Sequence, residues 1–493
     1  MTPELQLQLA VLLPLAGMIG IALAGRSPNL RETVTFIIAI ANAVNVWTLV
    51  PKVVAGARPE VVLFTIMPGL DLKFALEPLG MMFAAVAATL WIVNSIYSVG
   101  YMRGNKEVRQ TRFYACFALS IAAALGIAFA GNLLTLFIFY EILTLSTYPL
   151  VVHKETDEAR RGGRTYLGIL IATSIGLQLP AIIWTWNLTG TLDFAPGGTL
   201  AGKVQGISAG VLLALYMYGI GKAALMPIHK WLPAAMVAPT PVSALLHAVA
   251  VVKAGVFTVI KVIVYVFGLD LISSEPSTNW LVYAACITLT LASLIAMRQD
   301  NLKRRLAYST VSQLSYVILG AALGTAMGVV GAGLHIVMHA AGKITLFFCA
   351  GAIYVALHKT EISDMKGIGR IMPVTMACFA IGALSVIGLP PLGGSWSKML
   401  LMVGAADAGF QIVIGVLILS SLLNVAYLLP IPLHGFLYRP AGAPEGPVAI
   451  KEAPLPCLIA IVITASLCVV LFFTAGQIVE FLQPIATPVA PAG

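Results

Sequence analysis

Residues 219–255 read GIGKAALMPIHKWLPAAMVAPTPVSALLHAVAVVKAG. Two lysines, Lys222 and Lys253, stand inside apolar runs, and four prolines interrupt the join between those runs. A lysine in hydrocarbon costs roughly 2.5–3.5 kcal/mol on insertion scales, so such residues are rarely incidental. Transporters build ion sites near mid-bilayer from interrupted helices. The stretch therefore predicts an ion-handling site between two broken or joined membrane helices.

The rest of the chain is strongly apolar. Of its 493 residues, 59% are hydrophobic and only 10% are charged, whereas soluble proteins carry about 25% charged residues. Apolar runs of about 20 residues recur from end to end, and each is long enough to cross a bilayer. The composition predicts an all-α, polytopic membrane protein surrounded by lipid. The net charge of +9 does not indicate nucleic-acid binding, because the basic residues lie in short loops between apolar runs.

The apolar runs predict about fourteen transmembrane spans. The seventh is expected to break at Pro227, and the twelfth at the sequence LPPLGG of residues 389–394. The expected spans are 5–24, 33–50, 78–98, 113–130, 132–151, 165–187, 207–227, 241–267, 280–297, 304–323, 326–357, 372–405, 410–437 and 456–481.

Loop charges support this count and predict an orientation. Of the 29 lysines and arginines, 20 follow odd-numbered spans and 4 follow even-numbered spans, while the other five lie within spans. A missed or invented span would move every later loop to the other side and destroy this asymmetry. Because lysine and arginine concentrate in cytoplasmic loops, odd-numbered loops are predicted to be cytoplasmic and both termini to be outside.

The two proline-broken spans stand at matching positions. Each carries a lysine and a tryptophan near its break, Lys222 with Trp231 and Lys398 with Trp396. Paired interrupted helices are typical of transporters with inverted repeats. We expect three N-terminal helices (1–110), a first five-helix repeat (111–268), a second five-helix repeat (269–437), and a last helix with a tail (438–493).

Glu141 is the one acidic residue deep within a span, and Lys222 is its expected partner. Burial penalises the charged form of each group, and a partner of opposite sign restores it. Such a pair at 4 Å is worth roughly 4 kcal/mol at an effective dielectric of 20, so separating it could act as a switch. A purely structural ion pair that holds two helices together is the alternative interpretation.

Four further lysines lie inside spans, Lys253, Lys261, Lys343 and Lys398. Lys253 and Lys398 are far enough from span ends to suit a proton relay, because a desolvated amine gives up its proton more readily. Lys261 lies only a turn or two from its span end, so we expect it to reach the headgroup region instead.

His335, His339 and Lys343 recur at intervals of four in HIVMHAAGK, which places them on one helix face. Stacked titratable groups of this kind suit a proton wire, with histidine poised near neutral pH. A zinc site on the two histidines, or plain core histidines, are the alternatives. No acid or cysteine stands nearby in sequence, so we predict no metal.

Two other histidines have open roles. His247 precedes Lys253 by six residues and could support a bridging water between spans seven and eight, or a structural hydrogen bond. His229, at the break, could line the site or cap a helix end. The sequence contains no dinucleotide fingerprint, no CxxC and no haem motif, and GIGK lacks the full phosphate-loop pattern. No cofactor is therefore expected.

Three segments carry a resemblance to a known family. They are GKAALMPIHKWLPAAMVAPTPVSALLHAVAVVKAG, HIVMHAAGKITLFF and LSVIGLPPLGGSWSKMLL, with a glutamate in the fifth span. Together they resemble the antiporter-like subunits shared by respiratory complex I, Mrp-type cation/proton antiporters and membrane-bound hydrogenases. The resemblance implies fourteen helices, inverted repeats, outside termini and a central polar axis. It implies a proton pathway through Glu141, Lys222, Lys253, His335, His339, Lys343 and Lys398.

The resemblance also implies a setting in a bacterial inner membrane, with other membrane subunits as partners and protons, with Na⁺ as a candidate, as transported ions. Lys398 argues against the complex I subunit that carries glutamate in span twelve. The length fits the antiporter-like Mrp subunit that lacks the extra domains of the large one, although the span-eleven histidines look more like the large-subunit pattern. We expect an Mrp-type subunit, with a membrane module of a redox enzyme as the alternative and a structural scaffold as the third. No redox chemistry is expected in the chain itself.

Overall fold

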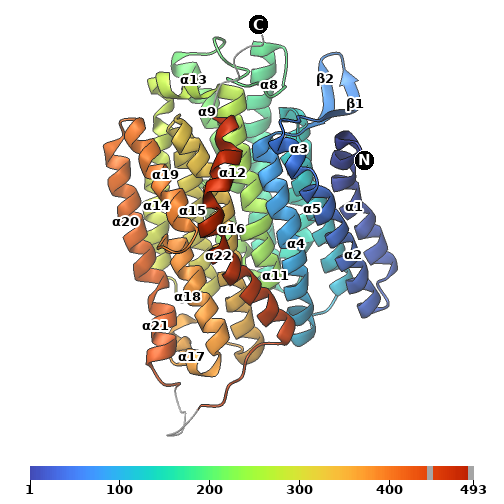
Figure 1. The fold of residues 1–493 in the computed structure, drawn as a ribbon, viewed down its shortest axis with the longest axis vertical. Helices are drawn as coiled ribbons and strands as arrows, with labels where there is room; N and C mark the ends of the chain where they lie inside the picture. Colours follow the sequence, from blue (N-terminus) through green and yellow to red (C-terminus); the bar gives the residue numbers. More distant parts are fainter. Residues whose placement is uncertain (441–447, 487–493) are drawn as a thin grey trace.

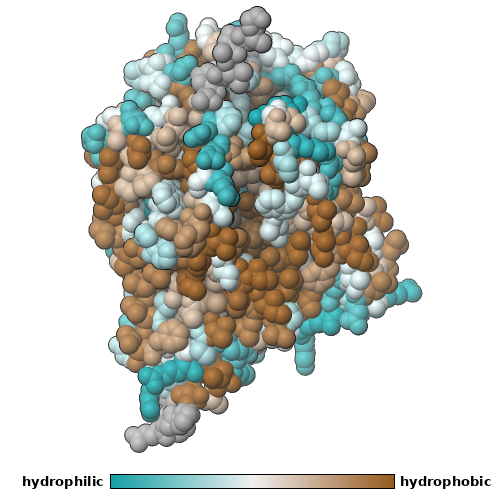
Figure 2. Space-filling view, viewed as in Figure 1, coloured by the Kyte–Doolittle hydropathy of each residue, from teal (hydrophilic) through white to brown (hydrophobic). Residues whose placement is uncertain are grey.

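A computed structural model describes residues 1–440 and 448–486 as a bundle of helices with one β-hairpin (Figure 1). Among these residues, eleven helices are long and apolar enough to cross a membrane. Figure 2 shows apolar side chains over much of the flank, with hydrophilic ones gathered towards the two ends. The polytopic helical architecture is therefore confirmed.

The count of fourteen spans is not confirmed by length and apolarity alone. Two of the three remaining expected spans, the seventh and the twelfth, are interrupted, and their apolar helices Gly206–Gly219 and Pro373–Ile387 are shorter than a full span. The third is the 21-residue helix Leu302–Ala322, which is not among the eleven.

The helices of the first half of the chain are α1 (Pro3–Leu23), α2 (Pro28–Trp47), α3 (Val50–Val54), α4 (Pro78–Gly104), α5 (Gln110–Phe129), α6 (Leu133–Val151), α7 (Asp157–Thr173), α8 (Leu179–Thr189), α9 (Gly206–Gly219), α10 (Trp231–Ala234), α11 (Thr240–Ala244) and α12 (Val251–Val262). Single π-helical turns join α7 to α8 and α11 to α12.

The helices of the second half are α13 (Leu269–Ser274), α14 (Trp280–Met297), α15 (Leu302–Ala322), α16 (Ala326–Leu357), α17 (Ile368–Ile371), α18 (Pro373–Ile387), α19 (Gly394–Asp407), α20 (Gln411–Leu428), α21 (Pro430–Leu437) and α22 (Leu455–Leu482). In Figure 1, α22 crosses the bundle obliquely, and it packs against α4, α16 and α18.

The hairpin of β1 (Glu60–Met67) and β2 (Leu70–Ala75) departs from the all-helical expectation. Its sequence, EVVLFTIMPGLDLKFA, contains β-branched residues and a Pro-Gly turn, which are the usual signals of a hairpin. The expected loop between spans two and three therefore carried a readable strand signal. The hairpin projects at the same end of the bundle as α13 (Figure 1).

Both predicted helix breaks are present. The twelfth span stops at Ile387 and resumes at Gly394, as the LPPLGG sequence predicts. The seventh stops at Gly219, eight residues before the expected break at Pro227, and continues through short 3₁₀ turns to α10. This boundary was misplaced because glycine and a buried lysine, rather than proline, end the regular helix.

Side-chain caps define where several helices begin. Asn132 accepts a hydrogen bond from the backbone N–H of Thr135 at the start of α6, and Thr325 accepts one from Gly328 at the start of α16. These bonds satisfy N–H groups that have no partner within the helix. The caps fix the helices on which the central charged residues stand.

Two segments form the centre of the bundle. Within their most apolar windows, Thr240–Phe267 is 94% buried and Ala326–Leu357 is 83% buried, compared with 33% for Gln411–Leu437. The first contains α11 and α12, and the second is α16. Polar residues on these helices are therefore enclosed by protein and not by lipid.

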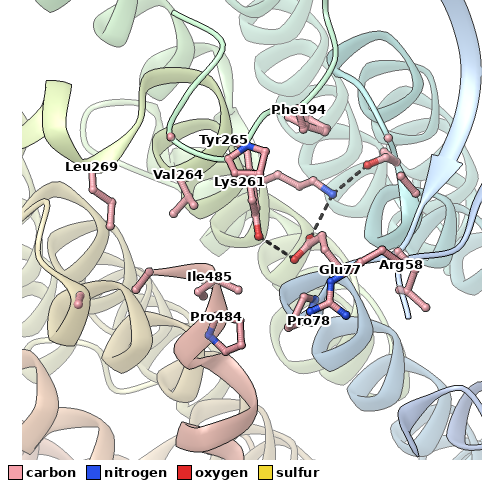
Figure 3. Close-up of a pocket in the computed structure, with 18 of the residues that line it drawn as sticks. Arg58, Glu77, Pro78, Phe194, Lys261, Val264, Tyr265, Leu269, Pro484 and Ile485 are labelled. Carbon is pink, nitrogen blue, oxygen red and sulfur yellow. Dashed lines mark hydrogen bonds and ion pairs between the residues drawn. The ribbon is translucent and has the colours of Figure 1, made fainter. Parts of the chain in front are cut away.

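Lys261 lies at the end of α12 nearest the hairpin, and its side chain is buried. The expectation that it reaches the headgroup region is therefore wrong. Its side chain is 1% exposed, and its Nζ lies 3.2 Å from the Glu77 carboxylate and 2.8 Å from the carbonyl oxygen of Ala130. Tyr265 donates a further hydrogen bond to Glu77 at 3.0 Å. These residues line a cavity of about 490 Å³ (Figure 3). Position near a span end could not reveal the neighbours that cover the amine.

Replacing Lys261 with methionine is expected to destabilise the fold by about 3 kcal/mol, because removing one partner leaves the other charge uncompensated. Thermal unfolding of the purified protein in detergent measures this. The matched control is Arg304→Met, which breaks an ion pair to Glu158 between two largely exposed side chains and should change little. Equal unfolding temperatures for both variants would contradict a buried, stabilising pair.

Candidate functional site

Lys222 lies in the short turn that follows α9, with its side chain fully buried. Its Nζ donates to the carbonyl oxygen of Tyr140 at 2.9 Å and to the hydroxyl of Thr144 at 2.6 Å. The same Nζ stands 3.1 Å from the centroid of the Tyr140 ring. The Tyr140 hydroxyl in turn accepts a hydrogen bond from the backbone N–H of Lys222. Helix α6 thus surrounds the amine with neutral groups.

The expected contact between Glu141 and Lys222 is not made. Both carboxylate oxygens of Glu141 are buried, and neither has a hydrogen-bond partner among the described residues. Successive residues on a helix point about 100° apart, so a lysine held by Tyr140 and Thr144 lies beside Glu141 without facing it. The carboxylate nevertheless acts electrostatically on Lys222.

Lys398 stands one turn into α19, directly after the second break, and is 5% exposed. Its Nζ donates to the carbonyl oxygen of Ile387 at 2.8 Å and to the hydroxyl of Ser421 at 3.1 Å. It also lies 4.8 Å from the centroid of the Tyr316 ring. As at Lys222, one carbonyl, one hydroxyl and one aromatic ring surround the amine.

Lys253 and His339 join the two central segments. The Lys253 Nζ lies 2.6 Å from the Nδ1 of His339, and both side chains are almost fully buried. One residue stands on α12 and the other on α16. An amine and an imidazole at this distance can share a proton directly.

His335 extends this contact towards Lys398. Its ring stacks on that of His339, with centroids 5.9 Å apart, and its Nδ1 lies 2.9 Å from the Ser397 hydroxyl. It also stacks on Tyr316 at 5.3 Å, the tyrosine whose other neighbour is Lys398. We call Lys253, His339, His335, Tyr316 and Lys398 the central polar chain.

Lys343 stands on the same face of α16, as its spacing predicts, but it joins a different set of groups. Its Nζ lies 2.6 Å from the Ser309 hydroxyl and 3.3 Å from the Leu306 carbonyl oxygen. Tyr427 donates to Ser309 at 2.9 Å and bonds Asn424. Lys343 is thus a side branch of hydroxyl groups on α15 and α20.

The two remaining histidines differ in placement. His247 is fully buried within the first central segment, in the π-helical turn before α12, and its ring lies 4.6 Å from that of Phe347 on α16. His229 is only partly buried in the turn after α9, where its ring lies 6.1 Å from Tyr308. Neither contacts the central polar chain through a hydrogen bond among the described residues.

Close backbone packing sets the position of Lys222. A Cβ atom at Gly255 would lie 2.7 Å from the Lys222 carbonyl oxygen, so only glycine permits this approach of α12. On the other side, the Trp231 indole donates to the carbonyl oxygen of Gly221 at 2.9 Å. The turn is therefore held between a helix and an indole.

The sequence did not indicate the neutral partners of these amines. Tyr140, Thr144, Tyr316, Ser397 and Ser421 come from four helices, and only their polar character inside apolar runs could have marked them. In the described residues, no group of three or more His, Cys, Asp or Glu side chains could hold a metal ion. The site is a line of amines, imidazoles and hydroxyls that can pass protons.

A protein-family model described as NADH:quinone oxidoreductase/Mrp antiporter, TM, matches residues 130–424. That range includes every side chain of the central polar chain, together with Glu141 and Lys222.

Relatives come from several quinone- and hydrogen-linked complexes. The chain is 32% identical over 397 residues to NADH-quinone oxidoreductase subunit N from Desulforudis audaxviator, covering 79% of this chain and 77% of that protein. It is 31% identical to NAD(P)H-quinone oxidoreductase chain 5 from Synechocystis, over 67% of this chain and 49% of that one. Against hydrogenase-4 component B from Escherichia coli the identity is 28%, covering 84% and 64%. The chain thus spans half to two thirds of the last two relatives.

Two solved structures share the fold. A chain of the Mrp complex from Dietzia sp. superposes with a TM-score of 0.87 at 22% identity, covering 99% of this chain and 97% of that one. A chain of an archaeal membrane-bound sulfane sulfur reductase superposes with a TM-score of 0.83 at 23% identity, covering 97% and 96%. At these identities the likeness concerns the fold alone.

Replacing Gly255 with alanine is expected to displace the turn that carries Lys222 and to cost about 1–3 kcal/mol, as overpacking does. Thermal unfolding in detergent measures the loss. Gly168→Ala is the control, because Gly168 lies exposed in α7 with open space around it, and alanine favours a helix. Two variants of equal stability would show that the close approach is not required.

Proposed function

The chain belongs to the NADH:quinone oxidoreductase/Mrp antiporter transmembrane family, and from that premise we propose that it carries protons across its membrane as one subunit of a multisubunit complex. Protons enter near Lys222 and Lys253, pass along His339 and His335, and leave near Lys398. Lys343 and its hydroxyl partners form a side branch from the same helix.

The central polar chain is the observation that carries this proposal. Each member contacts the next, from α12 through α16 and α15 to α19. The outer helices of the bundle that surrounds them are apolar. An imidazole accepts a proton on one nitrogen while it donates from the other. A neutral amine accepts a proton on its lone pair, and the ammonium that forms can donate one. Several buried amines without such a role would be a large and uncompensated cost.

Glu141 acts as a gate on this path. Its carboxylate is buried and lies beside Lys222 without a bond to it, so a small rotation of α6 changes the field at the amine. When the carboxylate faces the amine, the charged form of Lys222 is favoured; when it turns away, the proton is released towards Lys253. His229 and His247 contribute to the lining of the path near Lys222 and Lys253.

Two driving reactions suit the family. In the first, the subunit works in an Mrp-type cation/proton antiporter as a counterpart of the shorter antiporter-like Mrp subunit, with protons and Na⁺ as the exchanged ions. In the second, quinone or hydrogen chemistry in partner subunits drives it; the sequence relatives, which are redox-complex subunits, favour this second candidate. In both cases the partners are other membrane subunits.

The charge distribution supports a setting in a bacterial inner membrane. Both termini, the hairpin and the 490 Å³ cavity would then face the periplasm, while the loops rich in lysine and arginine face the cytoplasm. The domain division into an N-terminal part, two inverted repeats of five spans and a final helix is part of the same proposal.

Alanine at Lys222 or at Glu141 is expected to reduce proton transport by roughly 10²-fold, the usual contribution of a positioned proton-transfer group. The measurement is pH-gradient formation or dissipation in vesicles that contain the assembled complex. Lys203→Ala, at an exposed loop lysine, is the matched control. Normal transport by Lys222→Ala in a complex that still assembles would remove this residue from the pathway.

The two candidate driving reactions are distinguished by which ion or substrate changes the pH gradient across the vesicle membrane. For an Mrp-type complex, adding Na⁺ to vesicles with an imposed pH gradient should dissipate that gradient without any electron donor. Lys222→Ala should abolish the response. A pH gradient that forms only when a reduced cofactor or hydrogen is supplied, and that ignores Na⁺, would establish the redox-driven alternative.

A further inference from the structure

The two amines at the ends of the proposed path sit in matching cages. At Lys222 the ammonium meets the Tyr140 carbonyl oxygen, the Thr144 hydroxyl and the Tyr140 ring. At Lys398 it meets the Ile387 carbonyl oxygen, the Ser421 hydroxyl and the Tyr316 ring. An ammonium has three N–H groups, so two hydrogen bonds and one ring face occupy all of them.

The interior amines of the path lack such a ring. Lys253 contacts His339, and Lys343 contacts Ser309 and the Leu306 carbonyl oxygen, but neither has an aromatic face against its Nζ among the described residues. None of these four amines takes part in an ion pair in that part of the chain. The aromatic face therefore distinguishes the end amines from the relay between them.

We propose that Tyr140 and Tyr316 are positioning residues whose ring faces hold the proton on Lys222 and Lys398 in place of a carboxylate. This inference rests on the proposed proton path and names what sets its two ends. Both rings are fully buried; α6 contacts the seventh span through Lys222, and α15 packs against α19 of the twelfth span.

A ring has a different effect from a carboxylate. A cation over a buried ring gains a modest attraction that the neutral amine does not, which favours the charged form by about 2-fold to 30-fold. A carboxylate 4 Å away, at an effective dielectric of 20, would favour it by about a thousandfold and trap the proton. The ring thus supports a charge that must come and go during each cycle.

Other groups near these amines are few. At Lys222 the charged and titratable neighbours are Tyr140 and Glu141 on α6, and Lys253 lies two residues from the Gly255 contact on α12. Tyr166 on α7 stands near Tyr140. At Lys398 they are Tyr316 on α15 and His335 on α16. The expected pH response must be separated from theirs, above all from Glu141.

The test compares phenylalanine and leucine at each tyrosine in vesicles with the full complex. Leucine removes the ring, so the alkaline limb of the proton-transport profile should move to lower pH by about 0.3–1.5 units. Phenylalanine keeps the ring and should restore the wild-type profile, although Tyr140→Phe loses the hydroxyl that accepts from the Lys222 backbone. Tyr216→Leu, at a buried tyrosine of α9 bonded to Thr185, is the control and should leave the profile unshifted.

The outcomes separate this inference from the path itself. If Lys222→Ala abolishes transport while both leucine variants keep the wild-type profile, the ring faces have no role and the path stands. If Lys222→Ala transports normally, the proposed path fails first. A leucine variant that lowers the amount of complex but leaves the profile unshifted also overturns the inference, as does a phenylalanine variant that shifts the profile as leucine does. A combined Glu141→Gln and Tyr140→Leu variant should still show the shift that the ring loss causes.

Discussion

Holding amines in a low-dielectric interior without counter-ions is the constraint on which this structure depends. Lys222, Lys253 and Lys343 are fully buried and Lys398 nearly so, yet their partners are carbonyls, hydroxyls, rings and an imidazole. A buried charge without partners is prohibitive, whereas one bound to a carboxylate is fixed. Neutral donors and acceptors lie between these extremes, and they allow an amine to exist in both protonation states at one position.

At Lys398 the broken helix serves this constraint, because most carbonyl oxygens of a regular helix are already bonded within the helix. The carbonyl of Ile387 is free to accept from Lys398 since α18 ends there and the next helix begins only at Gly394. At the other end, the turn after α9 brings Lys222 against α6, and Gly255 lets α12 approach its backbone. The two central segments lie inside the bundle, 94% and 83% buried within their most apolar windows, so other helices of the protein cover their polar side chains.

The sequence predicted the parts of this arrangement that depend on local pattern. Apolar runs, Pro-Gly breaks and the i, i+4, i+8 face of His335, His339 and Lys343 all follow from spacing along one helix. What it could not predict depends on which helices meet. The bond between Lys253 and His339 joins residues 86 apart, and the choice of Tyr140 over Glu141 as the partner of Lys222 depends on helix rotation. Lys261 was misjudged for the same reason, since its partner Glu77 comes from a distant cap.

Lys222 and Lys398, the two ends of the proposed path, have matching neutral partners but different electrostatic surroundings. Glu141 acts on Lys222, whereas no acidic side chain acts in this way on Lys398 among the described residues. A movement of α6 therefore changes the charge balance at one end and leaves the other as it was. On the proposed proton path, a tyrosine ring at each end and a carboxylate near only one of them make the two ends different, and a neighbouring subunit that shifts α6 could use that difference to set the direction of transport.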